Sequence, residues 1–155
     1  MIPDDRSAGG DLATKKEKLE KLAAVPLFSD LSKRTLNRIL DNSKETTHVA
    51  GQTVVTQGHE GAGFHMILSG RAKVVRGGRK VATLGPGEYF GEMALLDGGR
   101  RTATVIAETD LVTLYIAQWG FKPLVRDNPQ MAWKIVVHLT KRLREEQKGS
   151  DALRA

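Results

Sequence analysis

The feature that most constrains the fold is a series of short β-branched runs between Thr46 and Ile116, most of them separated by glycine-containing turns. Val, Ile and Thr favour extended strands because their branched side chains restrict χ1, and glycine supplies the backbone freedom that tight turns need. Short strands at this spacing predict an antiparallel β-roll or jelly-roll barrel. The runs are THV, TVVT, FHMIL, AKVV, KVATL, TATVIA and LVTLYI.

Helical patterns flank this segment on both sides. Before it, Leu19 and Leu22 lie among lysines and glutamates in a weakly amphipathic pattern, and Ser32 is a suitable N-cap for a second helix. After it, Asn128 as N-cap and Pro129 at the first helical position open a long helix. We therefore expect a mainly β fold with flanking helices. The apolar stripe of the long helix is formed by Ala132, Val136, Leu139 and Leu143.

The changes of pattern set the expected boundaries within one compact domain of 155 residues. Polar and glycine-containing residues begin the chain, and no internal repeat follows them. The expected segments are a flexible tail at 1–11, an N-terminal helical segment at 12–45, the β-roll at 46–116, C-terminal helices at 117–145 and a tail at 146–155.

Several classes of protein are excluded by what the sequence lacks. It has no cysteine, so it forms neither disulfides nor zinc–thiolate sites. No apolar run approaches the ~20 residues of a membrane span, and no secretory signal begins the chain, so a cytoplasmic protein is expected. Neither GxSxG nor a Walker A motif occurs, and we expect no enzyme. The histidines lack metal-ligand spacing, so no metal site is expected: His48, His59, His65 and His138.

The net charge of +6 would suit a nucleic acid, an acidic membrane surface or a small anion. At both ends, however, lysines and arginines interleave with glutamates, as on solvated helix faces. No run of basic residues is typical of a nucleic-acid-binding arm. DNA binding is therefore not expected from the charge pattern.

The chemistry concentrates in residues 87–105, GEYFGEMALLDGGRRTATV. Gly91 lets backbone amides approach a ligand, and a helical turn beginning near Glu92 would point unpaired N–H groups at a phosphate. The Glu92 carboxylate only accepts hydrogen bonds, so a sugar hydroxyl is its natural partner. The planar fork of Arg101 suits two phosphate oxygens. Sugar and phosphate together indicate a nucleotide, although a simple ion pair between Glu92 and Arg101 is the alternative.

The motif FGEMALL…RRTATV closely resembles the phosphate-binding cassette of the cyclic nucleotide-binding domain family, which includes catabolite activator protein, the cyclic-nucleotide-dependent kinases and cyclic-nucleotide-gated channels. The resemblance extends from about Leu27 to Leu143 and includes PLFSDLS, ILSGRAKV and LGPGEYFGE. It implies a β-roll whose C-terminal helix is a lid over the bound base. It also implies a sensor that binds a cyclic nucleotide and needs no other cofactor. Because the sequence ends soon after the last helix, we expect this sensor to be a stand-alone module.

The resemblance implies a role for each matching residue. Gly91 and Glu92 would hold the ribose 2′-hydroxyl, and Arg101 the cyclic phosphate. Arg100 is expected to be exposed. Thr102 and Ala103 continue the Arg–Thr–Ala motif of channel domains that bind both nucleotides, so the motif leaves cAMP and cGMP open. The overall likeness to bacterial cAMP-responsive domains and to channels favours cAMP. The other implied contacts are phosphate-binding amides around Met93 and Ala94, base-lining side chains of Val74, Ala82 and Leu84, and lid residues Leu139, Arg142 and Leu143.

Alternatives stay open for the lid. Arg142 can lie over a purine or be solvated while its leucine neighbours fill core. Trp119 and Trp133 are expected to pack in the core rather than stack on a base. The terminal helix can pair with a second copy, giving a homodimer, or fold back alone.

The expected partners are a cyclic nucleotide and an unknown protein effector. Because the chain stops at Ala155, the sequence offers no room for a helix-turn-helix, which again argues against DNA binding. Two other functions stay open. The chain can be a regulatory domain of a longer channel or transcription factor, or an interaction module that binds no nucleotide.

Overall fold

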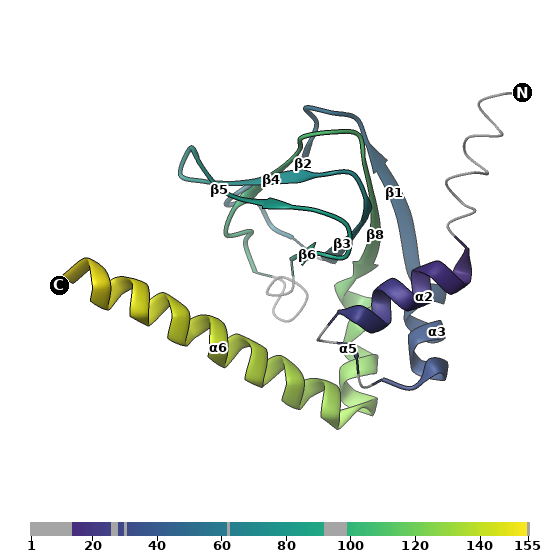
Figure 1. Ribbon diagram of the computed structural model, residues 1–155. Helices are drawn as coiled ribbons and strands as arrows, with labels where there is room; N and C mark the ends of the chain where they lie inside the picture. The colour runs from purple at the N-terminus through teal and green to yellow at the C-terminus, as the bar shows by residue number, and fades with distance from the viewer. Residues whose placement is uncertain (1–13, 26–27, 30, 62, 92–98, 155) are drawn as a thin grey trace, which may run out of the picture.

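The computed structural model describes residues 14–25, 28–29, 31–61, 63–91 and 99–154. Within these residues, two helices precede eight strands and two further helices follow them (Figure 1). The strands form two four-stranded antiparallel sheets, which confirms the mainly β prediction. The first sheet has the order β1 (Ser43–His48), β8 (Leu111–Ala117), β3 (Gly63–Ser69) and β6 (Tyr89–Phe90). The second has the order β2 (Thr53–Val55), β7 (Thr104–Ala107), β4 (Ala72–Arg76) and β5 (Arg79–Leu84).

Strand β3 is buried on both faces, because one face meets the helices and the other meets the second sheet. Phe64, Met66 and Leu68 belong to the helical core cluster, whereas Ile67 belongs to the cluster between the sheets. Adjacent residues of a strand point to opposite faces, so the uninterrupted run FHMIL suits a strand covered on both sides. The same alternation sends His65 into the interior of the roll.

The N-terminal helices are α2 (Lys15–Ala24) and α3 (Lys33–Asp41). The Ser32 hydroxyl accepts a hydrogen bond of 3.1 Å from the Thr35 amide, which confirms the predicted N-cap. Helix α2 is fastened to the first sheet, since Lys21 Nζ donates to the Leu68 carbonyl at 2.7 Å. Leu22 and Ile39 are fully buried beneath that sheet.

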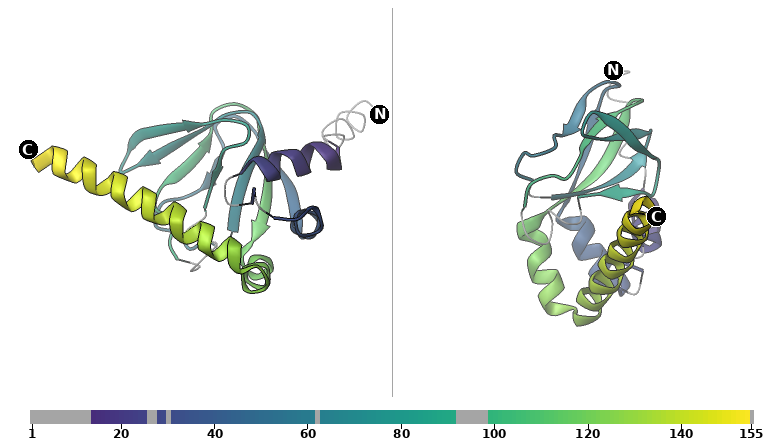
Figure 2. Two further views of the ribbon diagram at one scale, coloured as in Figure 1. Left: turned by 60° about the horizontal axis from the view of Figure 1, so that its bottom comes forward. Right: turned by 90° about the vertical axis from the view of Figure 1, so that its left-hand side faces the viewer.

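The C-terminal helices are α5 (Gln118–Asp127) and α6 (Pro129–Arg154). The long helix begins at Pro129, as predicted, and continues through the segment 146–155 to Arg154 rather than ending as a tail. The Asn128 side-chain amide donates back to the Leu124 carbonyl at 2.8 Å. Helix α6 packs against α5 at its start and then runs away from it (Figure 1 and Figure 2).

The apolar face of α6 that is buried differs from the predicted stripe. Met131 and Ile135 belong to the core, whereas Val136 is 53% exposed. Residues four apart lie on one helix face, so contact with the helical core selects the face that contains Met131 and Ile135. The expectation that Trp119 and Trp133 pack in the core is wrong, because their exposed fractions are 76% and 68%.

No helix in the described part of the chain is long and apolar enough to span a membrane.

Candidate anion-binding site

Arg101 is held by its backbone on the strand-like segment before β7. Its amide donates to the His59 carbonyl and its carbonyl accepts from the Gly58 amide, both at 2.9 Å. The neighbouring Arg100 forms an antiparallel bridge with Glu60, and its Nη1 donates to the Gly58 carbonyl at 2.7 Å. Arg100 is exposed, as expected. The loop 58–60 therefore fixes the backbone from which the Arg101 side chain departs.

The residues after Arg101 are fastened to β4 and to the same loop region. Arg76 Nε donates to the Thr102 carbonyl at 3.3 Å. Thr104 Oγ1 accepts from the Gln57 amide at 2.9 Å, and Gln57 Oε1 accepts from the Gly77 amide at 3.0 Å. The chain is thus held by hydrogen bonds at Arg101 itself and at the residues that lead from it into β7.

Arg101 is a half-buried cation without a described partner. Its Nη1 is inaccessible to solvent and makes no hydrogen bond among the described residues. Nor does Arg101 take part in any ion pair found in that part of the chain. Burial lowers the pKa of Arg101 from its ordinary value, and nearby Tyr115 acts in the opposite direction. Burying an unpaired charge costs free energy, so this position favours an anion.

Gly91 lies directly against Arg101, in agreement with their predicted membership of one site. A Cβ atom at Gly91 would collide with Arg101 Nη1 and lie 2.5 Å from the Gly63 carbonyl oxygen. Its φ of +91° is also in the left-handed region that favours glycine. The three residues predicted to follow it in the site, Glu92, Met93 and Ala94, lie outside the described residues, as does the ion-pair alternative between Glu92 and Arg101.

The predicted base-lining residues come together on the second sheet. Val74 pairs with Ala82 on β5 and with Val105 on β7, and Ala72 pairs with Leu84. Val74 and Leu84 are half-buried against the cluster between the sheets, whereas Ala82 is exposed.

Farther along the cassette, Ala103 is buried and Thr102 is exposed. Strand β4, which carries Val74, pairs with β7, and β7 begins three residues after Arg101. This pairing brings the lining strand close to the segment that carries Arg101.

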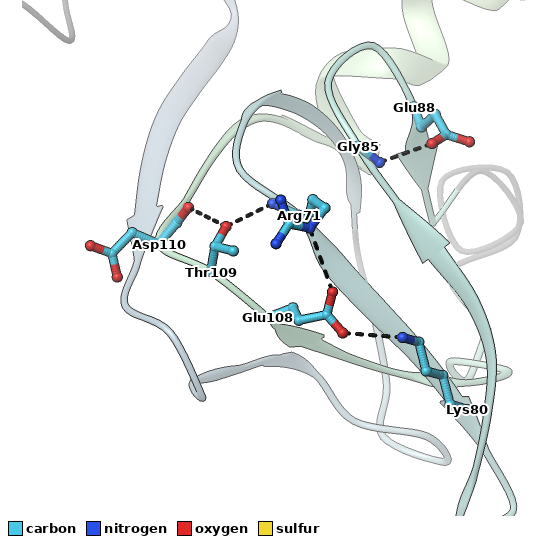
Figure 3. A network of polar contacts seen from close by, with 7 residues as sticks. All are labelled: Arg71, Lys80, Gly85, Glu88, Glu108, Thr109 and Asp110. Atoms are coloured by element: carbon cyan, nitrogen blue, oxygen red, sulfur yellow. Dashed lines mark hydrogen bonds and ion pairs between the residues drawn. The ribbon is translucent and has the colours of Figure 1, made fainter.

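Charged side chains link neighbouring strands of this second sheet (Figure 3). The Glu108 carboxylate is 3.1 Å from Lys80 Nζ and 3.6 Å from Arg71 Nε, and thus links the residues around β4, β5 and β7. The hydrogen bond from Lys80 lowers the pKa of the Glu108 carboxyl. These pairs are partly exposed, so they orient the strands more than they stabilise them.

The predicted lid residues are described only in part. Leu139 packs against the helical cluster, on the other side of the first sheet from the interior of the roll. Leu143 is 57% exposed. The side chain of Arg142 lies outside the description. Among the described residues, the structure thus brings Gly91 to Arg101 and pairs the lining strand β4 with β7, and the role of the lid residues stays a prediction.

A buried polar group beside the site was not predicted from the sequence. His65 stacks on Phe90, and its Nδ1 lies 3.0 Å from Thr113 Oγ1. Burial, followed by the charges of Arg101 and His48, lowers the pKa of His65 to about 3. The alternation in FHMIL could have placed His65 inside the roll, but no local pattern indicates its proximity to Arg101.

A comparison with protein-family models matches residues 45–128 to the cyclic nucleotide-binding domain. This match covers more than half of the chain, including the anchored arginine, Gly91 and the lining strands. The chain belongs to the cyclic nucleotide-binding domain family. These domains are non-catalytic sensors, so the prediction that the protein is not an enzyme is confirmed.

Individual relatives of this cyclic nucleotide-binding domain support the assignment. The cyclic AMP receptor protein of Thermus thermophilus is 34% identical over 83% of this chain and 62% of its own length. A cAMP-dependent protein kinase regulatory subunit of Yarrowia lipolytica is 39% identical over 67% of this chain and 28% of its own length. The crystal structure of Thermus thermophilus catabolite activator protein superimposes with a TM-score of 0.75, at 34% identity over 83% of this chain and 62% of that one. The chain thus spans less than two thirds of these relatives.

Proposed function

We propose that this domain is a cyclic nucleotide sensor that prefers cAMP and transmits occupancy by a movement of helix α6. The observation that carries the proposal is the Arg101 guanidinium, whose buried Nη1 has no hydrogen-bond partner among the described residues. A cyclic phosphate would supply the missing acceptor and charge. Each charge-assisted hydrogen bond gained there is worth about 1.5–3 kcal/mol.

The position of α6 supports the proposed transmission. The lining residues Val74 and Leu84 are half-buried, and Leu143 on α6 is exposed. Moving α6 over a bound base would bury both apolar surfaces, and only a ligand with different affinities for the two positions can drive this movement. A protein effector would then detect the altered position of α6. A cytoplasmic location and the absence of DNA binding stay predictions.

The ligand choice is tested by titration calorimetry with cAMP, cGMP and AMP. The name of the Thermus receptor protein and that of the Yarrowia kinase subunit both specify cAMP, which supports the stated preference. We expect saturable binding of both cyclic nucleotides, with cAMP tighter and AMP much weaker. No heat from either cyclic nucleotide would contradict the proposed function and favour the interaction-module alternative.

The ribose contact gives a prediction for Glu92. Glu92→Ala should abolish the difference in affinity between cAMP and 2′-deoxy-cAMP, because the carboxylate is the proposed acceptor for the 2′-hydroxyl. Competition binding with a fluorescent cyclic nucleotide measures this difference. A variant that still discriminates as well as the unmodified protein would contradict the role given to Glu92.

The outer face of α6 supports the homodimer as the oligomeric state. Trp133 is 68% exposed, Val136 53% and Leu143 57%; Val136 follows Trp133 by three residues, and Leu143 follows Val136 by one heptad. Such spacing forms the seam of two-stranded coiled coils. Light scattering should give a dimer mass, and Leu143→Glu should give a monomer. A monomer for the unmodified chain at high micromolar concentration would contradict this partner.

A further inference from the structure

Gly61 lies beside the Arg101 side chain, at a position whose backbone does not require glycine. Its φ is not among the positive values found at seven other glycines, so a side chain is conformationally allowed there. A Cβ atom at Gly61 would nevertheless lie 2.6 Å from Cζ and 2.8 Å from Cδ of Arg101. Non-bonded carbon atoms pack at about 3.5–4.0 Å. The position therefore needs glycine because the Arg101 side chain occupies the space of a Cβ atom, not because the local turn needs it.

A second glycine bounds the same guanidinium. A Cβ atom at Gly91 would collide with Nη1, as it would at Gly61 with Nε. The backbone of Arg101 cannot shift freely to relieve either collision, because its amide and carbonyl are both bonded to the loop at His59 and Gly58. The two glycines thus leave the space that the guanidinium occupies, and its buried Nη1 has no hydrogen-bond partner among the described residues.

We propose that Gly61 is a positioning residue for Arg101, holding the guanidinium where its unpartnered Nη1 can donate to a bound anion. The part of this inference that concerns affinity rests on the proposed function. The contact between Gly61 and Arg101 does not, and it can be measured without any ligand.

Gly61→Ala tests the proposal through cAMP affinity. The added methyl group should displace the guanidinium and weaken binding at least about tenfold, the loss expected for one charge-assisted hydrogen bond. Gly85→Ala is the matched control, because an added Cβ there would meet only Glu88 Oε1, at 3.9 Å. Unchanged affinity in Gly61→Ala would overturn the proposal.

Thermal unfolding of ligand-free protein separates a failure of this inference from a failure of the proposed function. If the surrounding backbone shifts and the guanidinium stays in place, overpacking in Gly61→Ala should lower the melting temperature by about 4 °C. This loss should vanish when Gly61→Ala is made in an Arg101→Ala background, because the colliding atoms are then absent. A loss of equal size in both backgrounds would overturn the proposal. If the unmodified protein binds no cyclic nucleotide, this comparison still tests the contact between Gly61 and Arg101. A loss seen only when Arg101 is present supports the contact, and a loss of equal size without Arg101 overturns it.

Discussion

The segment around Arg101 and the helix α6 are supported in opposite ways. Arg101 is anchored through its own amide and carbonyl, and its neighbour Thr102 is bonded to Arg76. Helix α6 is embedded in the core at Met131 and Ile135, near its start, and Leu139 packs against the same cluster, while Leu143 farther along is exposed. A fixed group suits selective binding of a ligand, because little conformational entropy is lost on association. A helix anchored at one end suits a movement that reports binding.

The largest expected effect concerns the anchored start of α6. Met131→Ala should lower the free energy of unfolding by about 2–5 kcal/mol, because the Met131 side chain is fully buried and its removal leaves a cavity in the core. Val136→Ala, on the same helix but 53% exposed, should change it by less than about 0.5 kcal/mol. Urea denaturation measures both. Equal effects would show that the two apolar faces of α6 do not differ as described.

The next effect concerns the half-buried cation. Arg101→Ala should weaken cAMP binding by at least about a hundredfold through the loss of two charge-assisted hydrogen bonds. The adjacent Arg100→Ala should change it less than about threefold, since this arginine is exposed and its Nη1 donates to the Gly58 carbonyl. Calorimetry compares the two variants. Similar losses would mean that net charge, not the buried position, determines binding.

The smallest effect is a pH dependence from His65, which faces His48 on β1, Tyr115 on β8 and the Arg101 charge. Its pKa is about 3 in the folded protein and about 6.5 when unfolded. Below pH 6.5 the unfolded chain binds the proton and the folded one does not, so stability falls as the pH is lowered. The expected slope from His65 is about 1.4 kcal/mol per pH unit between pH 6 and 4.

Urea denaturation of His65→Gln across that range isolates this contribution. The variant should lose stability less steeply than the unmodified protein, whatever its stability at pH 7. Equal slopes for the two proteins would contradict the assignment to His65.

Much of the fold could be predicted because it depends on local patterns. The β-branched runs gave the strands, Ser32 gave a cap, and Pro129 gave a helix start, each through residues adjacent in sequence. The cassette motif also placed Gly91 with Arg101, which the structure brings into contact.

The rest depends on contacts between distant segments. Helix α6 carries two apolar faces, and periodicity alone does not say whether the face of Met131 or that of Val136 meets the core. The loop that brings Gly61 to Arg101 is fixed by backbone pairing across the roll, so the sequence marked Gly61 only as part of a turn.

The most direct test of the account observes the Arg101 side chain itself by nitrogen-15 NMR during a cAMP titration. We expect the Nε and Nη signals of Arg101 to shift and to saturate with the calorimetric dissociation constant, because an anion supplies the missing acceptor. Adenosine, which lacks the phosphate, should leave them unchanged, and the Arg100 signals should hardly move in either titration. Arg101 signals that stay the same at saturating cAMP would contradict the claim that this guanidinium binds the ligand.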